Sequence, residues 1–193
     1  MSDSHEADAA AMMRLRDGDD LALNELMARW QQPLANYLAR LCGNEATALD
    51  LAQETFVRIY EARARYDTRG KFATWLYTIA GNLARNAHRW QQRHPTVSLD
   101  APTDTDGGTV ATHLPDGASQ PDASAERGER AAAVRTAISE LPEDQRAIVL
   151  MSEYEDRPHA DIAAVLGCTA KAVETRLYRA RQTLRERLLC WLN

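Results

Sequence analysis

The chain has 193 residues, of which 45% are hydrophobic and 26% are charged, and its formal net charge is −5. This composition excludes a collagen-like repeat and a wholly disordered chain. The N-terminus lacks the basic start and apolar run of a secretory signal, and no stretch of the first half is apolar and long enough to cross a bilayer, so we expect a cytoplasmic protein.

Positive charge is concentrated in two zones of this acidic chain. Residues 58–93 hold eight Lys and Arg against two acidic residues, and residues 157–187 hold seven against three. Two basic zones indicate two contacts with a polyanion, although solvated helix faces would give the same pattern. The three cysteines (Cys42, Cys168 and Cys190) are few and far apart, which predicts reduced thiols and no metal site, with redox sensing as the alternative role.

Helical periodicity dominates residues 1–94. We expect a helix over residues 7–16, a longer one over 21–41 that Pro33 kinks or splits, a third over 46–65 and a fourth from residue 72 to about 93. In the third helix the apolar face is expected to comprise Leu49, Ala52, Phe56, Ile59 and Tyr60.

Residues 95–127 differ from both flanks, because prolines, glycines and five aspartates occur there in a stretch that holds no basic residue before Arg127. Such a segment buries too little apolar surface to offset its ordering entropy, so we predict a flexible acidic linker. Helices are expected again over residues 127–140, from Pro142, from Pro158 and from Thr169. The predicted fold is therefore all-α, with two small helical domains at residues 1–94 and 128–193.

Residues 161–178 have the spacing of a helix-turn-helix. Ala163 is small where two crossing helices would touch, Gly167 supplies a left-handed turn, and Val173 returns to the shared core. Thr169 is placed to cap the second helix. A helical hairpin packed in a larger bundle is the structural alternative.

The outward positions of that second helix carry side chains suited to DNA. Arg pairs with guanine, Glu accepts from cytosine, and Thr and Tyr contact thymine methyls, while a leading Lys suits a phosphate. The candidate residues are Lys171, Glu174, Thr175, Arg176, Tyr178, Arg179 and Arg181. Glu174 is equally suited to an ion pair within its own helix, with Lys171 or Arg181.

The first domain offers two further candidate surfaces. Aromatic, amide and basic residues follow one another after a basic loop at residues 67–71, which is the chemistry of single-strand binding, with Phe72 and Ile79 expected in the core. The candidates there are Arg69, Lys71, Trp75, Tyr77, Asn82, Arg85 and Arg89. On the preceding helix Asp50, Gln53 and Glu54 form a polar face that fits protein docking better than acid–base catalysis, because no His or nucleophile accompanies it.

Taken together, these motifs resemble bacterial RNA polymerase sigma factors. The segments that carry the resemblance are residues 50–56 (DLAQETF), 72–80 (FATWLYTIA) with Asn82, 141–146 (LPEDQR) and 176–181 (RLYRAR). Their order and separation are similar to those of the extracytoplasmic-function (group 4, RpoE-like) class. The stretch at residues 155–159 (EDRPH) is unusual beside that pattern.

The resemblance implies a division of labour. Residues 1–94 would be region 2, which binds the β′ clamp helices of core polymerase through Asp50, Gln53 and Glu54. Region 2 would also open the minus-ten element with the candidate residues between Arg69 and Arg89. Residues 128–193 would be region 4, which docks on the β flap and reads the minus-thirty-five element. The resemblance also implies a non-catalytic promoter-specificity subunit without cofactor or small-molecule substrate. It further implies that an anti-sigma factor holds the protein inactive. A free-standing helix-turn-helix regulator, a nucleic-acid enzyme and a sigma-like adaptor are the alternatives.

Overall fold

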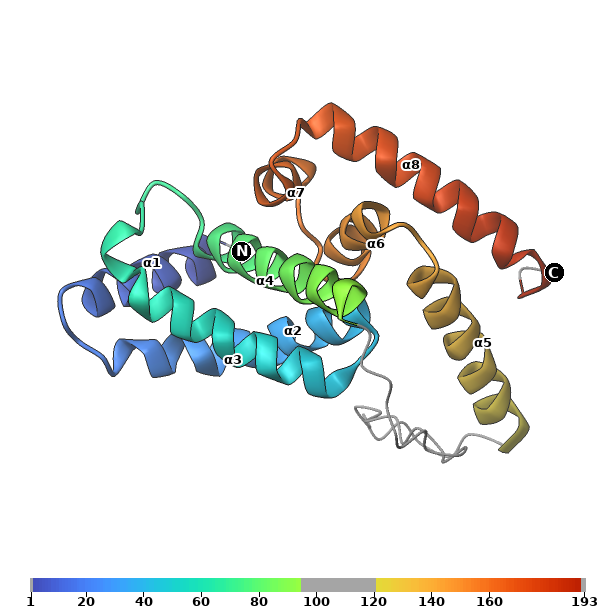
Figure 1. Ribbon diagram of the computed structural model, residues 1–193, viewed down its shortest axis with the longest axis horizontal. Helices are drawn as coiled ribbons and strands as arrows, with labels where there is room; N and C mark the ends of the chain where they lie inside the picture. Colours follow the sequence, from blue (N-terminus) through green and yellow to red (C-terminus); the bar gives the residue numbers. More distant parts are fainter. Residues whose placement is uncertain (1, 95–120, 192–193) are drawn as a thin grey trace.

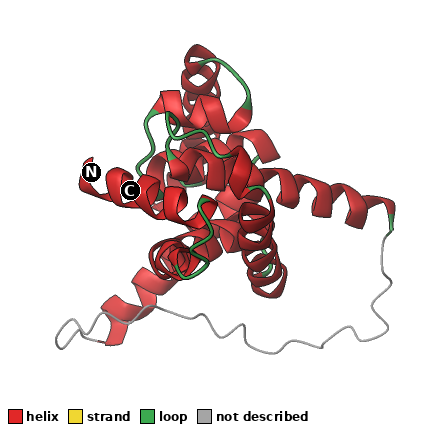
Figure 2. Cartoon of the chain, turned by 90° about the vertical axis from the view of Figure 1, so that its left-hand side faces the viewer, coloured by secondary structure: helices red, strands yellow, loops and turns green. Residues whose placement is uncertain are grey.

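The structure of the protein is a computed structural model, and residues 2–94 and 121–191 are described. Every regular element in these two ranges is helical (Figures 1 and 2), which confirms the predicted all-α class. The first domain contains α1 (Ser2–Arg16), α2 (Ala22–Cys42), α3 (Glu45–Glu61), the 3-10 turn η1 (Arg63–Arg65) and α4 (Phe72–Arg93). The second contains α5 (Pro121–Ser139), α6 (Glu143–Val149), the π-helical turn η2 (Leu150–Tyr154), α7 (His159–Leu166), α8 (Ala170–Arg187) and η3 (Leu189–Trp191).

The pairing of α2 with α3 organises the first domain. Gly43 ends α2 in the left-handed conformation at φ 69°, and the side chain of Asn44 then caps α3 by accepting a hydrogen bond from the Thr47 amide at 2.9 Å. This two-residue connection returns α3 along α2 (Figure 1), so Leu38 and Phe56 meet in one core.

Two expectations for the helices differ from the structure, and for α2 one of two alternatives, a split at Pro33, is excluded. Pro33 does not split α2, which is continuous because buried residues on both sides, such as Leu26 and Leu38, hold its two halves on one face. Leu49 lies outside the apolar face of α3 and is 54% exposed. The helix α5 begins at Pro121, inside the expected linker, of which residues 95–120 lie outside the described part of the chain.

The second domain contains the helix-turn-helix predicted from spacing. Gly167 ends α7 at φ 63°, and Thr169, two residues later, caps α8, the side-chain oxygen accepting from the Ala172 amide at 3.1 Å. Ala163 and Val173 are buried where the two helices meet. Each predicted role in the turn is therefore filled by the residue expected for it.

The two domains are in contact. The helix α7 packs against α4, and η2 packs against α2, so the N-terminal half of α4 lies beneath the start of the helix-turn-helix (Figure 1). The helix α8 lies on the far side of α7 from the first domain and keeps an open face.

Candidate DNA and polymerase interfaces

The outer face of α8 is the most exposed of the candidate surfaces. Val173, Leu177 and Ala180 point into the domain, which leaves the opposite side of the helix to solvent. Six of the seven predicted residues are exposed there, namely Lys171, Glu174, Thr175, Tyr178, Arg179 and Arg181. The seventh, Arg176, is half-buried and pairs with Asp144 at 3.4 Å, so it lies at the edge of this face.

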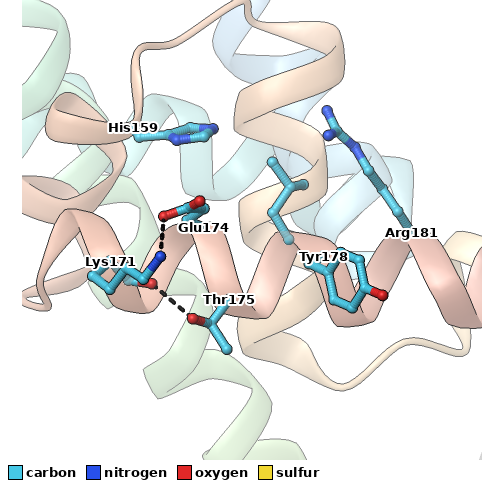
Figure 3. A pocket seen from close by; sticks show the side chains of 7 residues that line it. His159, Lys171, Glu174, Thr175, Tyr178 and Arg181 are labelled. Atoms are coloured by element: carbon cyan, nitrogen blue, oxygen red, sulfur yellow. Dashed lines mark hydrogen bonds and ion pairs between the residues drawn. The ribbon is translucent and has the colours of Figure 1, made fainter.

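An open hollow of about 390 Å³ lies on this face of the helix-turn-helix. Figure 3 shows its polar lining: Lys171, Glu174 and Thr175 from the first turns of α8, Tyr178 and Arg181 further along, and His159 from the start of α7 above Glu174. The sequence did not single out His159, whose role in the lining depends on how α7 crosses α8.

Within the hollow Glu174 is paired inside its own helix. The Lys171 ammonium donates to its carboxylate at 2.9 Å, and this hydrogen bond holds the pKa of Glu174 below its ordinary value. Of the two partners considered from the sequence, Lys171 is therefore the one in contact. Arg181 instead pairs with Glu153 of η2 at 2.6 Å.

The two basic residues of the loop before α4, Arg69 and Lys71, differ in their ion-pair partners. The Arg69 side chain is 90% exposed and contacts Asp67, which accepts from the Arg69 backbone and guanidinium at 3.0 Å. That guanidinium lowers the pKa of Asp67. Lys71, in contrast, is bound to Asp161 of α7 at 2.8 Å.

The candidate residues on α4 differ in how far their side chains are buried. Trp75 is half-buried against the ring of Tyr66, with 5.3 Å between ring centroids. Tyr77 is only 1% exposed, because its ring packs against Tyr37 of α2, with 5.0 Å between ring centroids, and its hydroxyl donates a 2.6 Å hydrogen bond to Glu155 of the second domain. Tyr77 is therefore not the exposed DNA-facing residue expected from the sequence: its ring belongs to the core of the first domain, and its hydroxyl is covered by the second.

The remaining α4 candidates form a line toward its C-terminal half. Arg85 is half-buried and donates to the side-chain oxygen of Asn82 at 2.6 Å, and Asn82 and Arg89 are exposed. Phe72 is buried, as expected, and Ile79 packs against the core while partly exposed.

The candidate docking face on α3 is both polar and apolar. Asp50 and Gln53 are exposed, and the half-buried Glu54 accepts from Arg58 at 2.6 Å. Leu49 and Val57 flank them and are 54% and 49% exposed. Large apolar side chains left open beside charged ones are typical of a protein interface. Sequence reasoning did not assign Leu49 or Val57 to this face. Their positions one turn before and one turn after Gln53 could have indicated that they lie on it.

Within the described ranges no three His, Cys, Asp or Glu residues lie close enough together to hold a metal ion. The helices of those ranges include none with the length and apolar character that a membrane span requires.

Comparison with known proteins gives the family. The family models for sigma-70 region 2 and sigma-70 region 4 match residues 26–94 and 131–184. The chain is 31% identical over 181 residues to the ECF RNA polymerase sigma-E factor of Haemophilus influenzae, covering 94% of this chain and 95% of that protein. It is 36% identical over 177 residues to the RNA polymerase sigma factor CarQ of Myxococcus xanthus, covering 92% and 95%.

A solved structure agrees on the fold. The structure of CnrH in complex with the cytosolic domain of CnrY matches with a TM-score of 0.69 at 24% identity, covering 95% of this chain and 98% of that one. The chain belongs to the sigma-70 family of RNA polymerase sigma factors. Within that family it is of the ECF class, whose members are promoter-specificity subunits rather than enzymes, as its motifs predicted.

Proposed function

We propose that this ECF sigma factor directs core polymerase to promoters through three separate surfaces. One surface, the α3 stripe, binds the β′ clamp helices. The α3 stripe consists of Leu49, Asp50, Gln53, Glu54 and Val57. The loop at residues 67–71 and α4 hold the minus-ten strand. The outer face of α8 reads the minus-thirty-five element while its domain rests on the β flap.

The open face of α8 is the observation that carries the proposal. Three basic side chains (Lys171, Arg179 and Arg181) project from a helix whose start is fixed by a cap and whose inner face is fixed by a core. A helix held in this way enters a major groove as a rigid element, and its exposed arginines donate to guanine edges or phosphates. The ion pair between Lys171 and Glu174 keeps a carboxylate available as an acceptor for a cytosine amino group.

Strand opening at the minus-ten element needs no nucleotide hydrolysis in this proposal. Aromatic rings on α4 stack on bases exposed by breathing of the duplex, and Arg69, Arg85 and Arg89 neutralise the adjoining phosphates. Each domain alone offers a small basic footprint, so it binds DNA weakly. Polymerase holds both domains at once, and their modest affinities multiply through effective concentration.

Control by an anti-sigma factor in the cytoplasm completes the proposal. Two structures of the same fold, CnrH with the cytosolic domain of CnrY and RpoE of Bartonella quintana with the anti-sigma factor NepR, are complexes. The second has a TM-score of 0.62 at 21% identity and covers 86% of this chain and 95% of that one. An inhibitor of this kind would cover the α3 stripe or the DNA-facing helices, and stress- or envelope-responsive promoters are the expected targets. Residues 1–94 and 128–193 are the proposed functional domains.

Run-off transcription on a genomic library, with purified core polymerase and with or without the full chain, tests the proposal. Discrete transcripts that require the chain, with upstream sequences sharing two spaced elements, are expected. Tight binding of the chain alone to duplex DNA, without any chain-dependent transcript, would favour a free-standing regulator and contradict the proposal.

A further inference from the structure

The segment between η2 and α7 contacts the first domain and has no part in the three proposed surfaces. Its middle residue, Asp156, has a φ of 48°, a left-handed conformation that Asp tolerates better than most residues. The Arg157 amide donates to the Met151 carbonyl at 2.9 Å, which closes the turn. This geometry directs the side chains of Glu155 and Arg157 onto α2 and α4.

Both side chains engage aromatic residues there. Glu155 accepts the 2.6 Å hydrogen bond from the Tyr77 hydroxyl. The Arg157 guanidinium lies over two rings at once, 5.0 Å from the centroid of Trp30 and 5.2 Å from that of Tyr77. Cation–π contacts of this kind are strongest where water is excluded, as it is around the buried Tyr77.

Further contacts extend the junction along both helices. Lys71 is held by Asp161 at 2.8 Å, the Arg40 guanidinium lies 4.6 Å from the ring centroid of Tyr154, and Arg146 donates to the Leu41 carbonyl at 2.9 Å. Two carboxylates of the second domain thus occupy an ammonium and an aromatic hydroxyl assigned above to the minus-ten strand. A carboxylate on Lys71 takes the place that a phosphate would take.

We infer that Glu155, Arg157 and Asp161 form an intramolecular latch, which closes the second domain over the minus-ten surface of the free chain. The identity of the covered surface rests on the proposed function; the closure itself does not. Polymerase and the promoter strand must displace the latch before Lys71 can meet DNA.

The junction has features of a contact that opens. The Nε atoms of Arg157 and Arg146 are buried without a hydrogen-bond partner in the described part of the chain. An unsatisfied buried donor offsets part of what the other contacts contribute, because water would hydrogen-bond that donor in the open state. These two unsatisfied donors therefore favour opening of the junction.

Zero-length cross-linking tests the latch in the full free chain. A carbodiimide joins an amine to a carboxylate only where the two are in contact, and the sequence holds just two lysines, Lys71 and Lys171. The first contacts Asp161 across the junction and the second contacts Glu174 within α8. Mass spectrometry of the wild-type chain should show both products, and the Lys171–Glu174 product serves as an internal control.

The double variant Glu155→Gln with Arg157→Ala should lower the yield of the Lys71–Asp161 product about tenfold, since it removes a charge-assisted hydrogen bond and a cation–π contact. The yield of the Lys171–Glu174 product should stay the same, as should the helical circular dichroism. The matched control is Glu126→Gln with Arg130→Ala, which removes an exposed pair within α5; it should leave both products unchanged. Absence of the Lys71–Asp161 product from the wild type, or its persistence in the double variant, would overturn the latch.

Transcription separates this inference from the proposed function. Because a closed state lowers apparent affinity by the fraction of open chain, the opened variant should reach half-maximal run-off transcription at a chain concentration up to about tenfold lower. A higher requirement would contradict the latch while the proposed function stands. Failure of all transcription, with the cross-link intact, would remove the proposed function and leave the closure.

Discussion

Lys171 and Glu174 form a 2.9 Å ion pair on the face of α8 that points away from the domain core. The hydrogen bond from Lys171 lowers the pKa of Glu174, so this carboxylate is ionised at neutral pH. The Lys171 ammonium offsets the repulsion between this carboxylate and DNA phosphates, and the carboxylate can accept a hydrogen bond from a base that donates one. The pair therefore favours sequence discrimination over general affinity.

Replacing Glu174 with Gln should relax promoter choice at one base pair. The amide keeps an acceptor but also donates, so discrimination at a single minus-thirty-five position should fall by ~1–3 kcal/mol, while affinity for other sequences rises slightly. Run-off transcription on a set of single-base promoter variants measures this. Glu186→Gln, an equal change of charge on the same helix, should act on all promoter variants alike; a uniform effect of Glu174→Gln as well would mean that Glu174 does not read a base.

Leu49→Ala should weaken binding to core polymerase without lowering stability. The side chain is 54% exposed in the free protein, so its loss creates no cavity, whereas burying it at an interface would contribute ~1–2 kcal/mol, or about tenfold in affinity. Titration of labelled chain with core polymerase and a thermal melt give the two quantities. Leu21→Ala, at a side chain 73% exposed and outside the α3 stripe, is the matched control and should change neither.

The charged part of the α3 stripe is tested by Asp50→Ala with Glu54→Ala. Charge-assisted hydrogen bonds to a basic partner contribute roughly 1.5–3 kcal/mol each, so core binding should fall at least about tenfold. The internal pair of Glu54 with Arg58 is exposed and contributes under ~1 kcal/mol, so the fold should persist. Unchanged affinity for core polymerase would remove this face from the docking surface.

What the sequence predicts well in this protein is local. The turn of the helix-turn-helix depends on a cap, a left-handed glycine and a small residue within 18 positions, and Thr169, Gly167 and Ala163 can each be assigned from spacing alone. The exposed face of α8 follows from the same periodicity. The start of α5 was missed, because Pro121 and an acidic composition resemble a linker although Pro is also favoured in the first turn of a helix.

Contacts between distant segments were not predictable in this way. Tyr77 fits a DNA-binding aromatic by composition, but its ring is buried against Tyr37, which lies 40 positions earlier, and its hydroxyl is bound by Glu155, which lies 78 positions later. Likewise the exposure of Leu49 depends on which side of α3 packs against α2, and an apolar residue one position from a polar stripe fits either face. Periodicity determines a face, but the partner that covers it is set by the tertiary fold.

Asp8 should give the stability of the first domain a distinctive pH dependence. It is 2% exposed, accepts a hydrogen bond from the Trp30 indole at 3.1 Å and pairs with Arg29 at 3.0 Å. Burial raises its pKa and outweighs the opposing effects of Trp30 and Arg29. The folded state thus binds this proton more tightly than the unfolded chain does, and lowering the pH through the raised pKa adds stability.

Asp8→Asn lacks that titration but keeps an acceptor for Trp30. The unfolding free energy of the wild type minus that of the variant should therefore increase as the pH falls from 7 toward 4. Urea denaturation of both proteins at several pH values measures the difference. A difference that is constant or that shrinks on acidification would show that the ion pair with Arg29, rather than burial, governs Asp8.

Gly167→Ala and Gly81→Ala should change stability in opposite directions. A Cβ added at either position meets no atom within 4 Å, so neither change introduces a clash. Gly167 has a φ of 63°, where an L side chain costs ~1–2 kcal/mol, and the helix-turn-helix should be destabilised by that amount. Gly81 lies inside α4, where Ala is favoured over Gly by about 0.5–1 kcal/mol, so its replacement should stabilise the protein. Thermal or urea denaturation of the two variants compares them directly. If both changes stabilised the protein, the turn would not require a left-handed residue, and the rigid presentation of α8 on which minus-thirty-five recognition depends would need another basis.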